Sequence, residues 1–323
     1  MIKYATIGSN FIVHRFIKAA SLVDNFEYGA VYSRTAKRGR ELADQYGVDT
    51  VYTSLEELAE DQDIDIVYIA SPNFLHAKQS ILMMKHAKHV LCEKPISSHG
   101  RELAEMEKVA KENNVILMEA MKSVHCPGYE TMRKNLDKLG KIRNVTFNFL
   151  QYSSRYDKYK SGIIENAFKP EVSNGALMDI GVYTVHMLLA LFGMPKDIHA
   201  KAIMLKTGTD AAGTITCDYG DFLATLIYSK ISSYEGNQIQ GELATMMIDK
   251  ISDIQTITIK YHDGSEEEIA THKKTTMYYE IQKFVDAVNN NEQARLLDVT
   301  KKQMMFLDEV RNQLGIVFPA DSK

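Results

Sequence analysis

The stretch that decides the fold is the N-terminal run Met1-Ile-Lys-Tyr-Ala-Thr-Ile-Gly8-Ser-Asn10-Phe-Ile-Val13. Met1 to Ile7 reads as a buried strand, and Gly8-Ser-Asn10 is typical of a tight turn. From Phe11 to Val23, apolar residues then recur at helical spacing. A strand, a glycine turn and a helix in this order predict the first unit of a doubly wound nucleotide-binding fold.

The same alternation continues through the first third of the chain. Further strands are expected at Tyr28–Tyr32, Asp65–Ala70, His89–Glu93 and Val115–Met118, with amphipathic helices between them, among them Ala36–Tyr46 and Ser98–Asn113. Such alternation requires right-handed crossovers and gives a parallel sheet with helices on both faces.

The rhythm changes near residue 122, where strands begin to dominate. They are expected at Ile142–Leu150, Ile198–Met204, Leu223–Lys230, Ala244–Ile248 and Gln255–Tyr261, with an apolar helix at Ala176–Phe192 and closing helices at Met277–Asn290 and Thr300–Leu314. Strands in succession imply an open, mainly antiparallel or mixed sheet. We therefore predict an α/β fold, with a Rossmann domain over residues 1–122 and an α+β substrate and dimerisation domain over 123–323. The closing helices are expected to pack back toward the Rossmann domain.

Length and composition exclude several classes of protein. The 323 residues are about twice the ~150 of a typical domain. With 38 Lys and Arg against 42 Asp and Glu, the net charge of -4 argues against a nucleic-acid-binding surface. We find no apolar run that approaches the ~18 residues of a membrane span. Cys92, Cys126 and Cys217 fit neither a disulfide framework nor a zinc site, and no signal peptide is recognised, so we expect a cytoplasmic protein without a metal centre.

The glycine turn is the first candidate cofactor site. Of the G-x-G-x-x-G signature only Gly8 is present, and we expect Asn10 to adopt the left-handed conformation that glycine would have provided. Val13 is expected to push the helix slightly off the strand. In the dinucleotide interpretation, Gly8, Asn10, Phe11 and Ile12 bind the cofactor; an ordinary structural turn is an equally good alternative.

The end of the second strand indicates which dinucleotide is bound. An acidic residue there binds the ribose 2′-hydroxyl of NAD, whereas arginine accommodates the 2′-phosphate of NADP. The chain has Ser33-Arg34, with Arg38 in the next helix and no acid before Glu41. This pattern favours NADP, with NAD as the second possibility; the alternative is a solvated basic helix start.

Two segments carry candidate catalytic groups. Lys94 follows the strand His89–Glu93 and precedes a proline, which places its ammonium at the edge where doubly wound folds bind ligands. Asp179, Tyr183 and His186 are spaced i, i+4 and i+7, which predicts one polar face on an otherwise apolar helix. Such groups are either paired or directed into a cavity, so two satisfied core residues at 183 and 186 are the alternative.

An aromatic and basic run, Tyr152-Ser-Ser-Arg155-Tyr-Asp-Lys158-Tyr-Lys160, follows the strand at 142–150. We consider it as a substrate lid, in which Tyr152 stacks on a ring and Arg155 or Lys158 reaches polar groups. A solvated surface loop is the alternative. The pattern also suits single-stranded nucleic acid, but nothing else in the sequence supports that partner.

Several short motifs, taken in order, resemble those of the glucose–fructose oxidoreductase/inositol dehydrogenase (Gfo/Idh/MocA) family. They are Ser33-Arg34, Ser71-Pro-Asn73 with His76, Glu93-Lys94-Pro95, Met118-Glu-Ala-Met121, Asp179-x-Gly181-x-Tyr183, Asn237-x-Ile-x-Gly241, Tyr279-Glu280 and Gly315-Ile-Val-Phe-Pro-Ala-Asp321. The dimeric dihydrodiol dehydrogenase-like branch, with Tyr at the position of Tyr183, is the most similar. The resemblance implies that Lys94 is catalytic, that Ser71, Asn73, His76 and Glu93 lie at the cofactor, and that Lys94-Pro95 is a cis peptide.

The resemblance implies an NAD(P)-dependent oxidoreductase. Hydride transfer to a carbonyl leaves an alkoxide that must be protonated. We expect Lys94 to polarise the oxygen, Tyr183 to act as acid and base, and Asp179 to orient Lys94 or the substrate, with His186 as the alternative proton donor. The expected substrate is a polyol, sugar, diol or dicarbonyl. The competing interpretation is a cofactor-binding regulator without turnover.

Assembly is predicted from the second sheet. Apolar side chains, namely Phe147, Phe149, Ile203, Leu205, Leu226, Tyr228 and Ile257, are expected on a face that no remaining helix covers. An exposed apolar face normally marks an interface. We therefore expect a homodimer through the second domain, or a tetramer by further pairing.

Overall fold

The computed structural model describes residues 1–234, 236–271, 274–293 and 297–322. The chain forms two compact units. The first unit comprises Met1–Ala120 and Met277–Asp298, and the second comprises Met121–Thr276 and Val299–Lys323. The domain limits expected from the sequence, 1–122 and 123–323, stay predictions.

The first unit is built on a parallel sheet. Its strands are β1 (Ile2–Ile7), β2 (Phe26–Tyr32), β3 (Thr50–Tyr52), β4 (Ile66–Ile69), β5 (His89–Glu93) and β6 (Leu117–Ala120). They lie in the order β3-β2-β1-β4-β5-β6, and each neighbouring pair is parallel. The strand order reverses direction between β1 and β4, which is the arrangement of the doubly wound dinucleotide-binding fold. The predicted fold class is confirmed for this unit.

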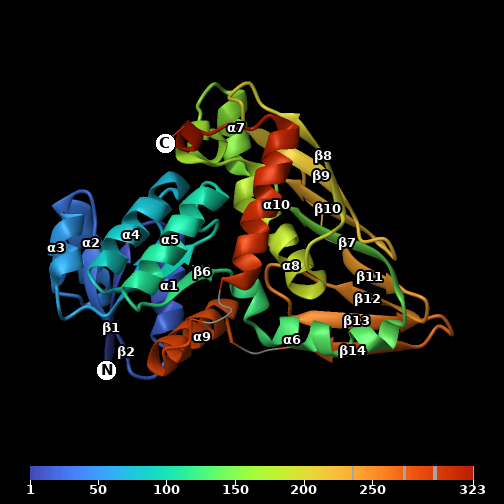
Figure 1. Ribbon diagram of the computed structural model, residues 1–323, viewed down its shortest axis with the longest axis horizontal. Coiled ribbons are helices and arrows are strands. Elements are labelled where there is room, and N and C mark those ends of the chain that lie inside the picture. Colours follow the sequence, from blue (N-terminus) through green and yellow to red (C-terminus); the bar gives the residue numbers. More distant parts are fainter. Residues whose placement is uncertain (235, 272–273, 294–296, 323) are drawn as a thin grey trace. The chain divides into compact units, whose positions relative to one another are not determined.

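Apolar helix faces bury this sheet. On one face, α1 (Phe11–Ala20), α2 (Ala36–Tyr46) and α9 (Thr276–Asn290) contribute to one core, in which the Phe16 ring stacks on Tyr68 with centroids 3.7 Å apart. The helices α4 (His76–Lys85) and α5 (Gly100–Glu112) pack side by side, and α3 (Leu55–Glu60) contacts α4 (Figure 1).

The edge strand β6 is closed by a side chain from the distant 277–298 segment. Gln293 Oε1 accepts the Leu117 backbone N–H at 2.7 Å, and Gln293 Nε2 donates to the Leu117 carbonyl at 3.2 Å. One amide thus satisfies both backbone groups of Leu117 as a further strand would.

The second unit contains an eight-stranded mixed sheet. Its strands are β7 (Ile142–Leu150), β8 (Asp197–Met204), β9 (Asp210–Asp218), β10 (Leu223–Ser229), β11 (Asn237–Gly241), β12 (Ala244–Ile248), β13 (Thr256–Tyr261) and β14 (Glu266–Ala270). Their order is β14-β13-β12-β11-β7-β10-β9-β8. Only the central β7–β10 pair is parallel, and the other neighbours are antiparallel. The predicted open, mainly antiparallel or mixed sheet is confirmed.

Helices pack on one face of this sheet. They include α6 (Pro127–Lys134), α8 (Val182–Phe192) and α10 (Asp298–Leu314), which Figure 1 shows on the same side of the strands. The stretch Pro170–Phe192 is long and apolar enough to span a membrane, but 72% of its most apolar window is buried inside the protein. That burial is typical of a core helix.

The predicted exposed apolar face is wrong. Phe147, Leu226, Tyr228 and Ile257 are all 0% exposed, because they lie on the helix-covered face. Of the seven expected residues, Ile203 alone is largely exposed, at 58%. Along β7, β9, β10, β12 and β13 the opposite face carries threonines together with apolar side chains. The threonines are Thr146, Thr214, Thr216, Thr225, Thr245 and Thr258, and the apolar residues include Leu223, which is 57% exposed, Ile227 and Met247. The homodimer and tetramer stay predictions, and the four fully buried residues do not contribute to an interface.

Candidate functional site

The residues predicted to bind the cofactor gather at the carboxyl ends of the first unit's strands. Gly8 follows β1, Ser33 follows β2, Ser71 lies two residues after β4, and Lys94 follows β5. Ligands of doubly wound folds bind at this edge, where the strand order reverses. The topology therefore brings together four segments that are far apart in the sequence.

Gly8 is required by the turn that it makes. Its φ is +122°, and a Cβ there would lie 2.7 Å from the Ala70 carbonyl oxygen. Asn10 does not adopt the left-handed conformation expected from the sequence, since its φ and ψ of -89° and 176° are extended. Its side chain instead caps α1, where it accepts the Ile12 N–H at 3.1 Å and donates to the Ala70 carbonyl at 3.3 Å.

The start of α1 exposes its first residue. Phe11 is 64% exposed and Ile12 is half-buried, whereas Val13 is fully buried in the core. The N-terminus of a helix attracts anions because its first backbone N–H groups point outward. The capped, glycine-initiated helix start is therefore suited to a pyrophosphate.

The end of β2 has the features of a phosphate site. Ser33 is buried, and its backbone N–H donates to the Tyr52 carbonyl at 3.0 Å. Arg34 and Arg38 are exposed, the latter in the first turn of α2. The guanidinium of Arg40, by contrast, is committed to Asp44 at 2.7 Å. Arg34 and Arg38 leave this edge positively charged.

The loop after β4 is tied to the loop after β5 by a buried histidine. His76 is 1% exposed, and its two ring nitrogens lie 2.8 Å from the carbonyl oxygens of Ser71 and Pro95. Burial lowers the pKa of His76 below its usual range. Ser71 Oγ donates to Gln79 Oε1 at 2.6 Å, and Asn73 begins a short helical turn, Asn73–Leu75. His76 thus links the loop after β4 to the loop that carries Lys94.

Lys94 is half-buried on a rigid loop. The Lys94–Pro95 peptide is cis, as predicted. The carboxylate of Glu93 accepts the Tyr68 hydroxyl at 2.6 Å and the Lys94 backbone N–H at 3.2 Å. One residue beyond the proline, the Ile96 N–H donates to the buried Glu119 carboxylate at 3.0 Å. The backbone on either side of Lys94 is therefore held by two carboxylates.

The predicted polar helix face lies in the second unit and begins with a π-helical turn, Leu177–Gly181, that leads into α8. Such turns occur often at functional sites. Asp179 and Tyr183 are both half-buried, and the Tyr183 ring lies 5.5 Å from that of Phe149. The carboxylate of Asp179 forms an ion pair with Lys230, which follows β10.

The environment of His186 differs from that of Asp179 and Tyr183, because His186 is buried. It is 3% exposed, and its Nδ1 is 2.6 Å from the Gln303 Oε1 of α10. Burial lowers the pKa of His186 to about 4, so its imidazole is neutral near pH 7. This is the environment of a satisfied core histidine, and we assign His186 no step in the chemistry.

Most of the aromatic and basic run forms a helix, α7 (Ser154–Lys160), so the alternative of a surface loop is wrong, and the lid stays a prediction. Tyr152 donates its hydroxyl to Asp157 at 2.7 Å, while Lys158 and Arg155 pair with Glu165 at 2.6 and 3.7 Å. All three predicted substrate residues are therefore engaged by neighbours.

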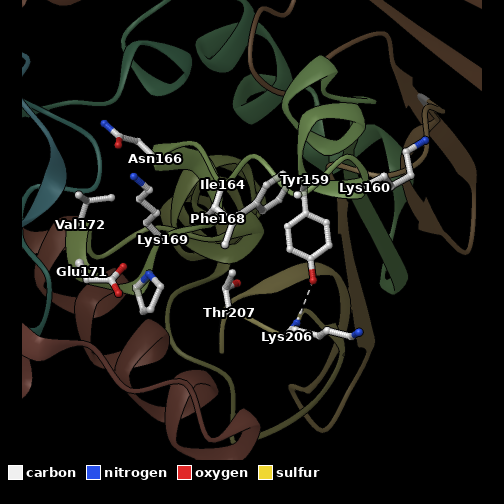
Figure 2. Close-up of a pocket in the computed structure, with 12 residues that line it drawn as sticks. Tyr159, Lys160, Ile164, Asn166, Phe168, Lys169, Glu171, Val172, Lys206 and Thr207 are labelled. Atoms are coloured by element: carbon white, nitrogen blue, oxygen red, sulfur yellow. Dashed lines mark hydrogen bonds between the residues drawn. The ribbon is translucent and has the colours of Figure 1, made fainter.

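A cavity of about 830 Å³ lies beside α7, but it is not lined by those three residues among the ones that the structure describes. Its walls include Tyr159, Ile164 and Phe168 (Figure 2). The Tyr159 hydroxyl accepts the Lys206 backbone N–H at 3.0 Å, and the ammonium groups of Lys160, Lys169 and Lys206 point to different sides in Figure 2. The cavity thus has no converging cation cluster.

Sequence reasoning missed Lys230, which pairs with Asp179, and Asp210, which holds the backbone of the same turn at Leu177. Lys230 was expected only as the last residue of a strand, and Asp210 lies in the stretch Thr209-Asp-Ala-Ala-Gly213, which was not assigned to any element. Their roles come from contacts across the sheet, and the sequence carries no local signal for them.

The amino-acid sequence matches a known family over most of its length. Residues 2–121 match the profile described as an oxidoreductase family with an NAD-binding Rossmann fold. Residues 129–246 match the profile of the GFO/IDH/MocA C-terminal domain. The chain is 44% identical to the NADP⁺-dependent scyllo-inositol 2-dehydrogenase IolU of Bacillus subtilis, with 99% of each chain covered. It is 40% identical to the uncharacterized oxidoreductase YgjR of Escherichia coli, covering 100% of this chain and 99% of that one.

Solved structures share the fold. The 3-ketoreductase KijD10 of Actinomadura kijaniata, crystallised with NADP and TDP-benzene, has a TM-score of 0.87 at 22% identity, covering 97% of this chain and 98% of that one. The aldose–aldose oxidoreductase of Caulobacter crescentus, complexed with glycerol, has a TM-score of 0.87 at 17% identity, with 97% of each chain covered.

Proposed function

Because the chain belongs to the Gfo/Idh/MocA family of NAD(P)-dependent oxidoreductases, we propose that it transfers a hydride between NADP(H) and the carbon that bears a ring hydroxyl in an inositol-like polyol. The 44% identity to a scyllo-inositol dehydrogenase over 99% of both chains supports this substrate class. The observation in the structure that carries the proposal is the place of Lys94, a half-buried lysine on a backbone that is held on both sides, at the carboxyl edge of the Rossmann sheet.

The residues at this edge fit NADP. The turn at Gly8 has no room for a side chain, the start of α1 is open to an anion, and Ser33 with exposed Arg34 replaces the acid that would repel a 2′-phosphate. The bound nicotinamide would accept or supply the hydride. Arg34, with Arg38 nearby, is proposed to hold the 2′-phosphate.

The chain's own groups handle the oxygen and the proton. We propose that Lys94 donates a hydrogen bond to the reacting oxygen, which favours the alkoxide that hydride transfer creates. Tyr183 is proposed to exchange the proton with that oxygen. Asp179 is proposed to accept a hydrogen bond from a substrate hydroxyl.

The test is turnover with purified protein. NADP⁺ reduction is followed at 340 nm with scyllo-inositol, myo-inositol, simple sugars and a cyclic diol, and NADPH oxidation is followed with the corresponding ketones. We expect NADP-dependent turnover of a ring polyol, and Lys94→Met should abolish it without changing NADPH binding. Tight NADPH binding without turnover of any compound would favour the cofactor-binding regulator instead.

A further inference from the structure

A buried lysine lies behind Asp179. The Lys230 side chain is 4% exposed and that of Asp179 is 27% exposed, so the ion pair turns its carboxylate toward solvent and its ammonium toward the core. The Lys230 backbone is held on both sides, since its N–H donates to the Ala211 carbonyl at 2.8 Å and its carbonyl accepts the Ser153 N–H at 2.9 Å. The backbone of Lys230 is therefore fixed next to β9 and the start of α7.

A second carboxylate completes the arrangement. Asp210, at the start of β9, is 1% exposed and accepts the Leu177 backbone N–H, at the first residue of the π-helical turn, at 2.7 Å. A Cβ at Gly175, where φ is +152°, would overlap Asp210 Oδ1, so the glycine permits this contact. Asp210 thus fixes the backbone of the π-helical turn, and Lys230 pairs with the side chain of Asp179 in the same turn.

The groups around Lys230 come from three other places in the fold. Asp179 pairs with it, Asp210 interacts with it electrostatically, and the Phe168 ring lies 5.8 Å from its Nζ. The Tyr228 hydroxyl faces Asp210. One cation therefore lies near two carboxylates and the ring of Phe168, and removing it would leave both acids without their buried counter-charge.

We propose that Lys230 is a positioning residue. It holds the Asp179 carboxylate ionised and in one orientation, so that this carboxylate can accept a hydrogen bond from a substrate hydroxyl. The inference rests on the proposed function for the role of Asp179, but the ion pair itself can be tested without any substrate. A misplacement of about 1 Å in a substrate-orienting group costs about 10²-fold in rate. An opposite charge within ~4–6 Å lowers the pKa of an aspartate by about 1 to 3 units.

The first measurement is the titration of Asp179 by carbon NMR of protein labelled at the aspartate carboxyl carbon, with the resonance assigned by Asp179→Asn. In Lys230→Met the titration midpoint of Asp179 should rise by at least about one pH unit. In Lys230→Arg, which keeps the positive charge, the midpoint should stay close to that of the unmutated protein. Lys201→Met, at an exposed lysine of β8, is the matched control and should leave the midpoint unchanged. Equal midpoints in Lys230→Met and the unmutated protein would overturn the proposal.

The second measurement is a double-mutant cycle in turnover. Lys230→Met should lower kcat about 10²-fold, yet it should cost little more in the Asp179→Asn background, because Lys230 acts through that carboxylate. If Lys230→Met does not fold, the double variant, which has lost both charges of the pair, is compared with Asp179→Asn alone. Full activity in Lys230→Met, or an equal loss in both backgrounds, would refute the role. Absence of turnover in the unmutated enzyme would refute the proposed function, and the titration would then decide the present inference.

Discussion

Cofactor selection by Arg34 can be tested quantitatively. A charge-assisted hydrogen bond to phosphate contributes about 1.5–3 kcal/mol, or one to two decades of affinity. Because Arg34 is exposed and Arg38 lies one turn further along, water and the second guanidinium reduce the effect of a single substitution. We therefore expect Arg34→Ala to weaken NADPH binding about tenfold, near the lower end of that range, and Arg34→Ala with Arg38→Ala to approach a hundredfold.

The assay is titration of protein or nucleotide fluorescence with NADPH and NADH, at two ionic strengths. NADH lacks the 2′-phosphate, so its dissociation constant should change less than about twofold in either variant, and added salt should reduce the NADPH preference of the unmutated protein. Lys18→Ala, at the exposed C-terminal end of α1, is the control for loss of a positive charge. Equal affinity of the unmutated protein for NADPH and NADH would show that Arg34 does not bind the 2′-phosphate. Equal weakening of both nucleotides by Arg34→Ala would lead to the same conclusion.

Three further outcomes are expected. Tyr183→Phe should lower turnover by ~10²–10⁴ while NADPH affinity is retained, and near-full activity would remove Tyr183 from the proton step. Gly8→Ala should destabilise the fold by about 1–3 kcal/mol in thermal unfolding, because its φ of +122° and the nearby carbonyl exclude a Cβ; an unchanged midpoint would contradict this. Burial lowers the pKa of His186 to about 4, so the unfolded chain binds a proton that the folded chain does not as pH falls from about 6.5 toward 4. Stability should therefore fall over that range, by an amount on the order of 3 kcal/mol, and His186→Gln, measured by urea unfolding, should lose this part of the pH dependence.

Elements with strong local patterns could be predicted from the sequence. The strand His89–Glu93 and the helix Ala36–Tyr46 have the predicted limits, because a short buried apolar run and an amphipathic helix that ends before Gly47 are local signals. The strand β9 was missed, since Asp210–Asp218 is rich in Thr, Ala and Gly, and Ile215 is its one large apolar residue. At Gly213 a Cβ would overlap the Tyr228 hydroxyl, a constraint that no local pattern contains.

The candidate site divides in the same way. The position of Lys94 at a strand end follows from a motif of three consecutive residues, and the structure adds only what holds it. The spacing of Asp179, Tyr183 and His186 assumed a regular α-helix, whereas a π-helical turn precedes α8, and Asp179 and Tyr183 are half-buried while His186 is in the core. The partner of Asp179 is 51 residues away in the chain, and such a pairing depends on the register of strands that no short pattern determines.

The closure of the first sheet by Gln293 also has a consequence for how the chain is made. During synthesis the ribosome releases the strands β1–β6 first, but α9 and Gln293 emerge only after the whole 121–276 segment, on the order of ten seconds later at ~5–20 residues per second. In that interval the sites of Ile281 and Phe284 in the core have no occupant, and the backbone of Leu117 is unpaired along the edge of β6. An open strand edge beside an apolar groove is a template for pairing with other chains. The nascent protein should therefore depend on chaperones until its last quarter has been translated, although the finished molecule has this edge sealed.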